Sequence, residues 1–319
     1  MTLRVVVTDY TFPDLAQEEA AARAGGASFA AFQCKSAAEV AQAVAGADVA
    51  VVQFARFGPE AARAVTPGAT VIRYGVGYNN IDLPAARAAG LRLGYVPDYC
   101  TDEVADHTAA AALSLLRKLP QLDASVRRGD WAAVKIAKPM KPFSQTVFGF
   151  FGLGQIGRAV LARLQGFGFR FIAADPGLSA EQAQGLGVTL VDGDRLLREA
   201  DLVALHAPAT SATTGFFNAA RLARMQPHAL IVNAARGQLI VEEDLAAALT
   251  SGTIAGAALD VFQVEPLAPD HVLRQAPNLL LTPHAAWYSE AAIHRLQQLV
   301  AEDIARALRG EGPRKPVPD

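Results

Sequence analysis

The chain has 319 residues, of which 51% are hydrophobic and 19% are charged, and its formal net charge is −2. This composition is typical of a globular protein of about two domains, with no basic stripe that would favour nucleic acid or an anionic membrane surface. The sequence starts without a signal-peptide pattern, and no apolar run approaches the roughly 18 residues of a membrane span. Two cysteines, Cys34 and Cys100, fit a reducing compartment better than a disulfide framework, so we expect a cytoplasmic protein.

Residues 1 to about 97 alternate short apolar runs with stretches of helical spacing. A first helix is expected after Asp14, which is a plausible N-cap. The other expected helices cover residues 37–45, 60–65 and 83–89, and the expected strands cover 3–8, 29–32, 48–54, 70–74 and 91–96. Such alternation predicts a parallel sheet with helices on both faces.

The segment Thr101–Val104 resembles a helix start, and an Ala- and Leu-rich helix is predicted to continue to Leu119, just before Pro120. We interpret this helix as the first connection into a second domain. Residues 121–145 are predicted to be helical at first and then irregular.

Residues 152–157 read Gly-Leu-Gly-Gln-Ile-Gly, between an apolar run over 146–151 and a helical pattern over 158–165. In this context Gly152 allows a tight turn, Gly154 lets the backbone approach a pyrophosphate, and Gly157 lets the helix pack close to the strand. The next apolar run ends at Asp175, which is 175 − 157 = 18 residues after the last glycine. An acid at about that distance holds the ribose hydroxyls of a dinucleotide. The alternative is a structural turn followed by an incidental surface acid.

After Asp175 the same alternation continues. Helices are expected over 180–185, from 194, and over 218–225, 242–249 and 289–308, and strands over 188–191, 201–206, 230–234, 254–260 and 279–282. The last ten residues contain three prolines and are expected to form a loose tail.

Ligands of doubly wound sheets bind at the carboxyl ends of the strands. Polar residues just past those ends are therefore candidates for function, namely Asp175, His206, Arg236, Asp260 and His284. His206 is expected to have a structural or backbone-contact role. No Cys and His spacing suggests a metal site.

Arg236, Glu265 and His284 have the side chains that hydride transfer to a 2-keto acid requires. A guanidinium binds a carboxylate and carbonyl in a fork. An imidazolium gives its proton to the carbonyl oxygen, and a neighbouring carboxylate favours that charged form. Simpler interpretations remain, in which the arginine lies on the surface, the histidine is a satisfied core residue, and the glutamate merely starts a loop.

Together with the glycine turn and Asp175, three segments make the chain resemble the D-isomer-specific 2-hydroxyacid dehydrogenases over nearly its whole length. They are Val232–Gly237, Leu259–Pro266 and Leu281–Glu290. The segments Arg73–Asp82, Asp175-Pro176 and Pro283–Glu290 are most similar to the C-terminal-binding-protein branch and its bacterial relatives.

The resemblance implies an α/β fold of two doubly wound parallel-sheet domains. A Rossmann NAD-binding domain (99–288) would be inserted into a smaller, flavodoxin-like substrate domain (1–98 and 289–319).

The resemblance also implies roles for individual residues. Arg236 binds and polarises the substrate, His284 is the acid/base, and Glu265 is its partner. The backbone N–H groups of Val76 and Gly77 hold the substrate carboxylate, while Arg73 and Trp287 line the pocket. The implied contacts to NAD, with Asp260 at the nicotinamide amide, are Thr108, Gly152, Gly154, Gln155, Ile156, Gly157, Asp175, His206, Ala207, Pro208, Thr213, Ala234, Ala235, Asp260 and His284.

We therefore expect an NAD-dependent enzyme that reversibly reduces a small 2-keto acid to the D-2-hydroxy acid. Asp175 favours NAD, because a carboxylate there repels the 2′-phosphate of NADP. The resemblance further implies a homodimer that uses residues 120–145. The alternative is an NAD(H)-sensing, corepressor-like scaffold with residual dehydrogenase activity.

Overall fold

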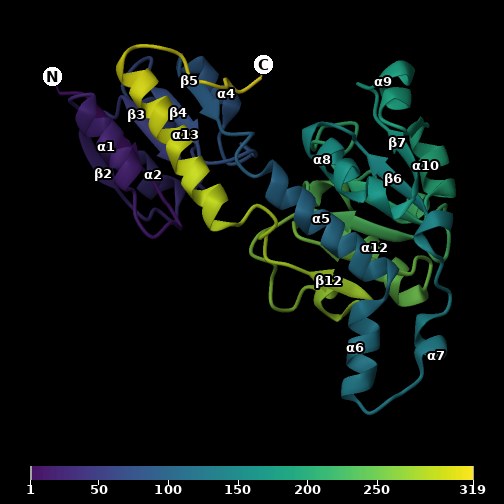
Figure 1. Ribbon diagram of the computed structural model, residues 1–319. Coiled ribbons are helices and arrows are strands. Elements are labelled where there is room, and N and C mark those ends of the chain that lie inside the picture. Colours follow the sequence, from purple (N-terminus) through teal and green to yellow (C-terminus); the bar gives the residue numbers. More distant parts are fainter. Residues whose placement is uncertain (1, 319) are drawn as a thin grey trace. The chain divides into compact units, whose positions relative to one another are not determined.

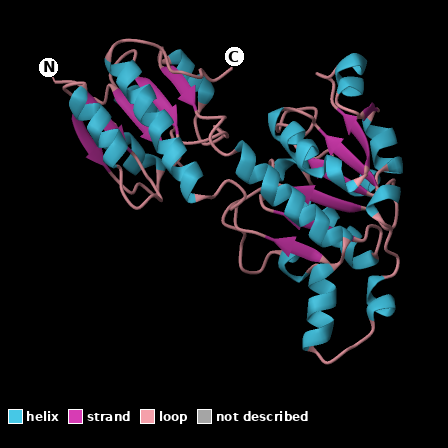
Figure 2. Cartoon of the chain, viewed as in Figure 1, coloured by secondary structure: helices cyan, strands magenta, loops and turns pink. Residues whose placement is uncertain are grey.

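The computed structural model describes residues 2–318, which divide into two compact units. Unit 1 contains the chain up to Cys100 and again from Tyr288, and unit 2 contains Thr101–Trp287. Each unit is built on one parallel sheet with helices on both faces (Figures 1 and 2). Both sheets confirm the predicted fold class, in which a Rossmann domain is inserted into a smaller doubly wound domain.

Unit 1 has a five-stranded sheet in the order β2-β1-β3-β4-β5, which is the flavodoxin-like order. The strands are β1 (Arg4–Val7), β2 (Ser28–Ala31), β3 (Val49–Val52), β4 (Thr70–Arg73) and β5 (Arg92–Tyr95). The helices are α1 (Ala16–Ala24), α2 (Ala37–Ala43), α3 (Pro59–Ala64), α4 (Leu83–Ala88) and α13 (Glu290–Leu308). Helices α2, α3 and α4 cover one face of the sheet, and α13 packs beside α1 (Figure 1).

Unit 2 has a seven-stranded sheet in the order β12-β11-β10-β9-β6-β7-β8. The strands are β6 (Val147–Phe151), β7 (Arg170–Ala174), β8 (Thr189–Leu190), β9 (Leu202–Leu205), β10 (Leu230–Asn233), β11 (Gly256–Leu259) and β12 (Leu279–Leu281). Strand order reverses between β6 and β9, so the loops after these two strands lie at the switch point where doubly wound sheets bind ligands.

Helices cover both faces of this sheet. Leucines and alanines of α5 (Thr101–Leu116), α8 (Gln155–Leu164) and α9 (Ala180–Gly185) pack on one face. The other face is covered by α10 (Gly193–Glu199), α11 (Ala219–Leu222) and α12 (Glu242–Ser251). Strand β6 has Val147 and Phe151 in one core and Phe148 and Phe150 in the other, which explains its unbroken apolar sequence.

The connection from α5 into the second sheet differs from the prediction. Helix α5 ends at Leu116, and Lys118 takes a left-handed conformation with φ of 51°. Pro120 then lies in the first turn of a new helix, α6 (Leu119–Arg127), instead of ending the previous one. A proline fits there because its missing N–H would have no partner in a first turn. Helices α6 and α7 (Ala133–Ala137) extend away from the sheet of unit 2 (Figure 1).

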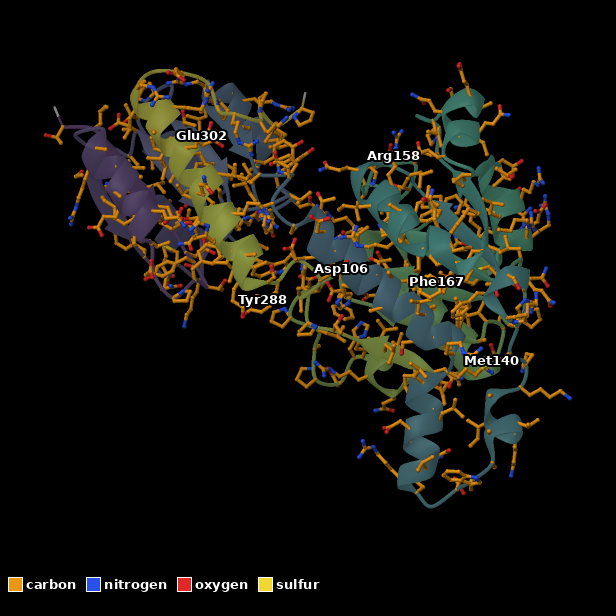
Figure 3. The ribbon with its side chains drawn as sticks, in the orientation of Figure 1. Asp106, Met140, Arg158, Phe167, Tyr288 and Glu302 are labelled. Carbon is orange, nitrogen blue, oxygen red and sulfur yellow. The ribbon has the colours of Figure 1, made fainter. Side chains whose placement is uncertain are left out.

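Helix α5 is joined to α8 by charge as well as by packing. Arg163 of α8 donates hydrogen bonds to Asp102, at 2.9 Å, and to Asp106, which Figure 3 labels on α5. These bonds fix the helix that carries Thr108, one of the predicted cofactor contacts.

Two expectations at the ends of the chain are wrong. The N-cap of α1 is Leu15, and Asp14 instead accepts a hydrogen bond from the N–H of Ala16 at 3.0 Å. The last residues are not a loose tail, because Val317 is buried and its N–H donates to the carbonyl of Leu93 at 2.9 Å. The tail therefore extends the edge of the sheet beside β5.

Ion pairing also holds this tail. Arg314 donates two hydrogen bonds to the carboxylate of Asp98, at 2.8 and 2.7 Å, and it holds the pKa of that carboxyl below its usual value.

In the described part of the chain, no helix combines the length and the apolar character that crossing a bilayer requires.

Candidate active site

The glycine turn after β6 lies against the loop after β9. Gly152 has φ of +88°, and a β-carbon on it would lie 2.7 Å from the backbone nitrogen of Ala207. A β-carbon on Gly157 would lie 3.0 Å from the carbonyl oxygen of Gly152, so α8 packs tightly on the turn. At Gly154, by contrast, a β-carbon would meet no described atom within 4 Å. The turn thus leaves its backbone open on the side of Gly154.

Asp175, at the end of β7, is held on this turn. Its Oδ2 accepts the N–H of Leu153 at 2.7 Å, and its Oδ1 accepts the N–H of Gly177 at 2.8 Å. The carboxylate therefore lies beside the glycine turn, as an acid that binds a ribose would need to.

Two buried polar atoms, both on predicted cofactor contacts, have no hydrogen-bond partner within residues 2–318. They are Oγ1 of Thr108 on α5 and Nε2 of His206 after β9. Burial lowers the pKa of His206 to about 4, so this ring is neutral at physiological pH. Both atoms, with the open backbone at Gly154, fit a nucleotide that supplies polar partners to this edge of the sheet.

The loop that follows His206 is fixed by one threonine. Oγ1 of Thr213 donates to the carbonyl of Pro208 at 2.6 Å and accepts the N–H of Thr210 at 2.8 Å. The predicted contacts Ala207, Pro208 and Thr213 thus belong to a single ordered turn at the switch point.

Arg236 lies in the turn after β10, and Asn233, the last residue of that strand, holds this turn by hydrogen bonds. The buried Asn233 donates from Nδ2 to the carbonyl of Arg236 at 2.8 Å and accepts the N–H of Ala235 at 3.0 Å. A β-carbon on Gly237 would lie 2.0 Å from the carbonyl carbon of Phe262, so the turn packs directly on the loop after β11. Neither Asn233 nor Gly237 was predicted as a site residue, although an Arg-Gly pair after a strand is a visible signal.

Glu265 and His284 form a hydrogen-bonded pair. Nδ1 of His284 lies 2.7 Å from Oε2 of Glu265, and Oε1 of Glu265 accepts the N–H of Phe262 at 3.0 Å. Burial opposes ionisation of Glu265, but the hydrogen bond and charge of His284, with a smaller contribution from Arg236, bring its pKa below the usual value. An ionised carboxylate can only accept, so Nδ1 carries a proton and Nε2 is the atom left to exchange one.

The backbone of His284 is held in an uncommon conformation by Asp260. His284 has φ of +53°, and its N–H donates to the carbonyl of Asp260 at 2.8 Å. The Asp260 carboxylate is 2% exposed and accepts the N–H groups of Ala285 and Ala286, each at 2.9 Å, and the hydroxyl of Thr282 at 2.6 Å. Such bonds offset the cost of a left-handed residue.

The predicted residues around the substrate divide between the units. Arg73, Val76 and Gly77 lie at the end of β4 and in the following loop of unit 1, and Trp287 is the last residue of unit 2. The Arg73 guanidinium donates to the carbonyl of Tyr74 and lies 6.0 Å from the ring centre of Phe54. Among residues 2–318, no three His, Cys, Asp or Glu side chains gather as a metal site would need.

One family model matches residues 109–286, more than half of the chain, and is described as D-isomer specific 2-hydroxyacid dehydrogenase, NAD binding domain. A glyoxylate reductase of Korarchaeum cryptofilum is 38% identical over 248 residues, which are 76% of this chain and 74% of that protein. A D-3-phosphoglycerate dehydrogenase of Methanocaldococcus jannaschii is 38% identical over 278 residues, 86% of this chain but 52% of that longer enzyme. This chain thus spans about half the length of that relative.

Solved structures agree in fold. A protein of Thermus thermophilus superposes with a TM-score of 0.86 at 31% identity, covering 99% of this chain and 100% of that one. A D-lactate dehydrogenase of Treponema pallidum superposes with a TM-score of 0.81 at 26% identity, again over 99% and 100% of the two chains.

Proposed function

The chain belongs to the D-isomer-specific 2-hydroxyacid dehydrogenases, NAD-dependent enzymes that act on CH–OH groups, and we propose that it interconverts a small 2-keto acid and its D-2-hydroxy acid. The observation that carries this proposal is the 2.7 Å pair of His284 and Glu265. Glu265 follows the carboxyl end of β11 and His284 follows that of β12, and both strands belong to the sheet that carries the glycine turn.

In the proposed reaction, bound NADH would supply the hydride to C2 of the keto acid. His284 gives the proton on Nε2 to the carbonyl oxygen and recovers one from solvent after turnover. Glu265 holds Nδ1–H and stabilises the imidazolium form. Arg236 binds the substrate carboxylate and polarises the carbonyl, for which its permanently charged fork is suited. The reverse reaction uses neutral His284 as the base.

The dinucleotide is proposed to lie on the glycine turn, with its pyrophosphate at the N-terminus of α8. There Gln155 and Ile156 offer first-turn N–H groups. Asp175 would hold the ribose hydroxyls. Thr108 and the turn formed by residues 207–213 would complete the contacts, and Ala234 and Ala235 would follow β10 beside the nicotinamide.

Unit 1 is proposed to supply the substrate-binding part of the enzyme. The backbone N–H groups of Val76 and Gly77, in the loop after β4, would hold the substrate carboxylate, and Arg73 and Trp287 would line the pocket.

The test is oxidation of NADH with glyoxylate, hydroxypyruvate, pyruvate and longer 2-keto acids. We expect turnover with at least one of them, and a large loss in Arg236→Gln but not in Arg198→Gln, which removes an exposed arginine of α10. Binding of NADH without turnover on the whole panel would contradict the proposal. The scaffold alternative finds no support among the relatives named above, and these do not single out the C-terminal-binding-protein branch.

We also propose a homodimer in which α6, α7 and the chain between them meet a second copy. This arm carries apolar side chains that are open to solvent: Trp131 is 92% exposed, and Val126, Val134 and Leu119 are also exposed. It returns to the sheet near Met140, labelled in Figure 3. Sedimentation should give twice the chain mass, and Trp131→Ser should shift the protein toward monomer.

A cytoplasmic location is proposed because Cys34 and Cys100 are free thiols.

A further inference from the structure

A second pair of an acid and a histidine, Glu242 and His271, lies beside the loop that carries Glu265. Glu242 is the first residue of α12 and is 4% exposed. His271 precedes the short 3₁₀-helix Val272–Gln275, and its Nε2 lies 3.3 Å from Oε2 of Glu242. Nothing in the proposed hydride transfer uses either residue, so their burial calls for another explanation.

The hydrogen bonds around His271 show which way this pair is oriented. Nδ1 of His271 faces the backbone N–H of Leu273 at 3.4 Å and accepts from it. In the neutral ring the proton is therefore on Nε2, the atom that lies 3.3 Å from Oε2 of Glu242. The other oxygen of Glu242, Oε1, accepts the N–H of Gln263 at 2.7 Å. Both oxygens of this carboxylate thus have partners, and one partner is the loop that leads to Glu265.

The peptide between Phe262 and Gln263 is fixed from several sides. Glu242 accepts its N–H, and Gly237 packs so closely that a β-carbon there would lie 2.4 Å from the nitrogen of Gln263. The side chain of Gln263 donates to the carbonyl of Ile240 at 2.7 Å. A shift of this peptide would therefore have to break bonds to Ile240, just before α12, and to Glu242, at the start of α12.

Glu265 depends for its position on the preceding peptide, the one between Val261 and Phe262. The N–H of Phe262 donates to Oε1 of Glu265 at 3.0 Å, which leaves Oε2 for Nδ1 of His284. The order of contacts runs from His271 to Glu242, then to Gln263, through the adjoining Phe262 to Glu265, and finally to His284.

We propose that Glu242 and His271 are positioning residues for the acid/base pair, and that they act by fixing the loop from which Glu265 reaches His284. This inference rests on the proposed roles of Glu265 and His284 in hydride transfer. It assigns no contact with substrate or cofactor to Glu242 or His271. Their effect on the reaction must pass through Glu265.

The variant that tests this is Glu242→Gln. The amide keeps an oxygen for the N–H of Gln263, but it presents an NH₂ group to Nε2–H of His271, so the pair is broken with little change in volume. Glu243→Gln is the matched control, because it makes the same change at the next, exposed residue of α12. We expect Glu242→Gln to lower kcat by about tenfold with little change in KM, since small misplacements of reacting groups are costly. The control should leave kcat and KM unchanged.

A double-mutant cycle separates positioning from a general loss of stability. In a Glu265→Gln background there is no carboxylate left to position, so adding Glu242→Gln should change kcat by less than about twofold. The same tenfold loss in both backgrounds, or no loss in Glu242→Gln alone, would overturn the inference while leaving the proposed function intact. A Glu265→Gln enzyme with unchanged turnover would instead contradict the proposed role of Glu265 itself.

A readout without turnover completes the test. In the wild-type ¹H–¹⁵N spectrum, the carboxylate of Glu242 should shift the amide signal of Gln263. In Glu242→Gln this shift should be lost, and the amide signal of Phe262 should move as well. His271→Ala should move both amides in the same direction, because it removes the side chain that faces Oε2 of Glu242. Unmoved amides in both variants would show that the loop is held without this pair and would overturn the inference.

Discussion

Gly237 packs on Phe262 with no room for a side chain between them: a β-carbon at position 237 would lie 2.0 Å from the carbonyl carbon of Phe262 and 2.2 Å from its oxygen. This contact joins the turn that carries Arg236 to the loop that carries Glu265. The proposed substrate-binding arginine and the proposed partner of the acid/base are therefore carried by loops in direct backbone contact.

Gly237→Ala should therefore impair both activity and stability. The methyl group must push the two loops apart, and overpacking of this kind costs about 1–3 kcal/mol. We expect kcat to fall by about 10- to 100-fold, because misplacement by an ångström has effects of that size. Steady-state kinetics and urea unfolding measure the two effects. Gly185→Ala, at a glycine of α9 with open space around it, should change neither. Wild-type activity in Gly237→Ala would mean that the loops tolerate separation.

Asp260→Asn should loosen the loop around His284. The buried carboxylate accepts two N–H groups and one hydroxyl with its two oxygens. An amide has one oxygen, so at least one of these three donors loses its acceptor. An unpaired buried donor costs about 1–3 kcal/mol, so the free energy of unfolding should drop by that amount and kcat should fall with it. A crystal structure should show His284 leaving its left-handed conformation. Asp270→Asn, at an exposed position, is the control, and equal effects of the two substitutions would refute this explanation.

Asp175→Ala should weaken selection for NADH over NADPH. Without the carboxylate, the site loses an acceptor for the ribose hydroxyls and no longer repels a 2′-phosphate. We expect KM for NADH to rise by about tenfold and the ratio of kcat/KM for NADPH to that for NADH to rise, as loss of a charged hydrogen-bond partner predicts. The substitution also removes the acceptor for the N–H of Leu153, so binding of both cofactors should be measured directly. An unchanged ratio would count against this role of Asp175.

The neutral His206, whose Nε2 is buried, should make stability depend on pH. Its pKa in the folded protein is about 4, whereas an unfolded chain binds the proton at about pH 6.5. Between these values the unfolded state holds more protons, so acidification from about pH 6.5 to about pH 4 should cost about 2–3 kcal/mol of unfolding free energy. The loss should level off below the folded pKa. Urea unfolding at stepped pH measures it.

Replacing His206 separates its contribution from those of other groups. His206→Gln should remove this part of the pH dependence, even if it lowers stability at every pH. His294→Gln, at an exposed histidine of α13, should retain the wild-type profile. Parallel profiles for wild type and His206→Gln would show that the ring does not titrate as its burial requires.

Features that depend on local sequence were predictable. The apolar run before Gly152, the glycine spacing and the acid at the next strand end lie within 30 residues, and both sheets formed as the alternation indicates. Local rules failed where a neighbour competes for the same position. Asp14 is a good N-cap residue, yet Leu15 is the N-cap of α1, and Pro120 lies in the first turn of a helix where it was expected to follow one.

Contacts between distant segments were beyond the sequence. Glu242 belongs to a run of three acids in the first turn of α12, a pattern that usually marks an exposed helix start. Its burial depends on Gln263 and His271, which come 21 and more residues later and reach it only after β11 has formed. The clamp of Asp260 on residues 282–286 is likewise made across two strands.

Unit 1 is assembled from both ends of the chain, so it can be completed only after the last helix has been synthesised. Helix α13 packs on α1, and its Gln297 donates to the carbonyl of Asp14 at 2.8 Å, so a helix made last completes a layer begun first. Unit 2 is a continuous segment and is translated before α13. The dinucleotide-binding part can thus fold while the first hundred residues still expose the surface that α13 will cover. Aggregation during expression should accordingly begin from unit 1.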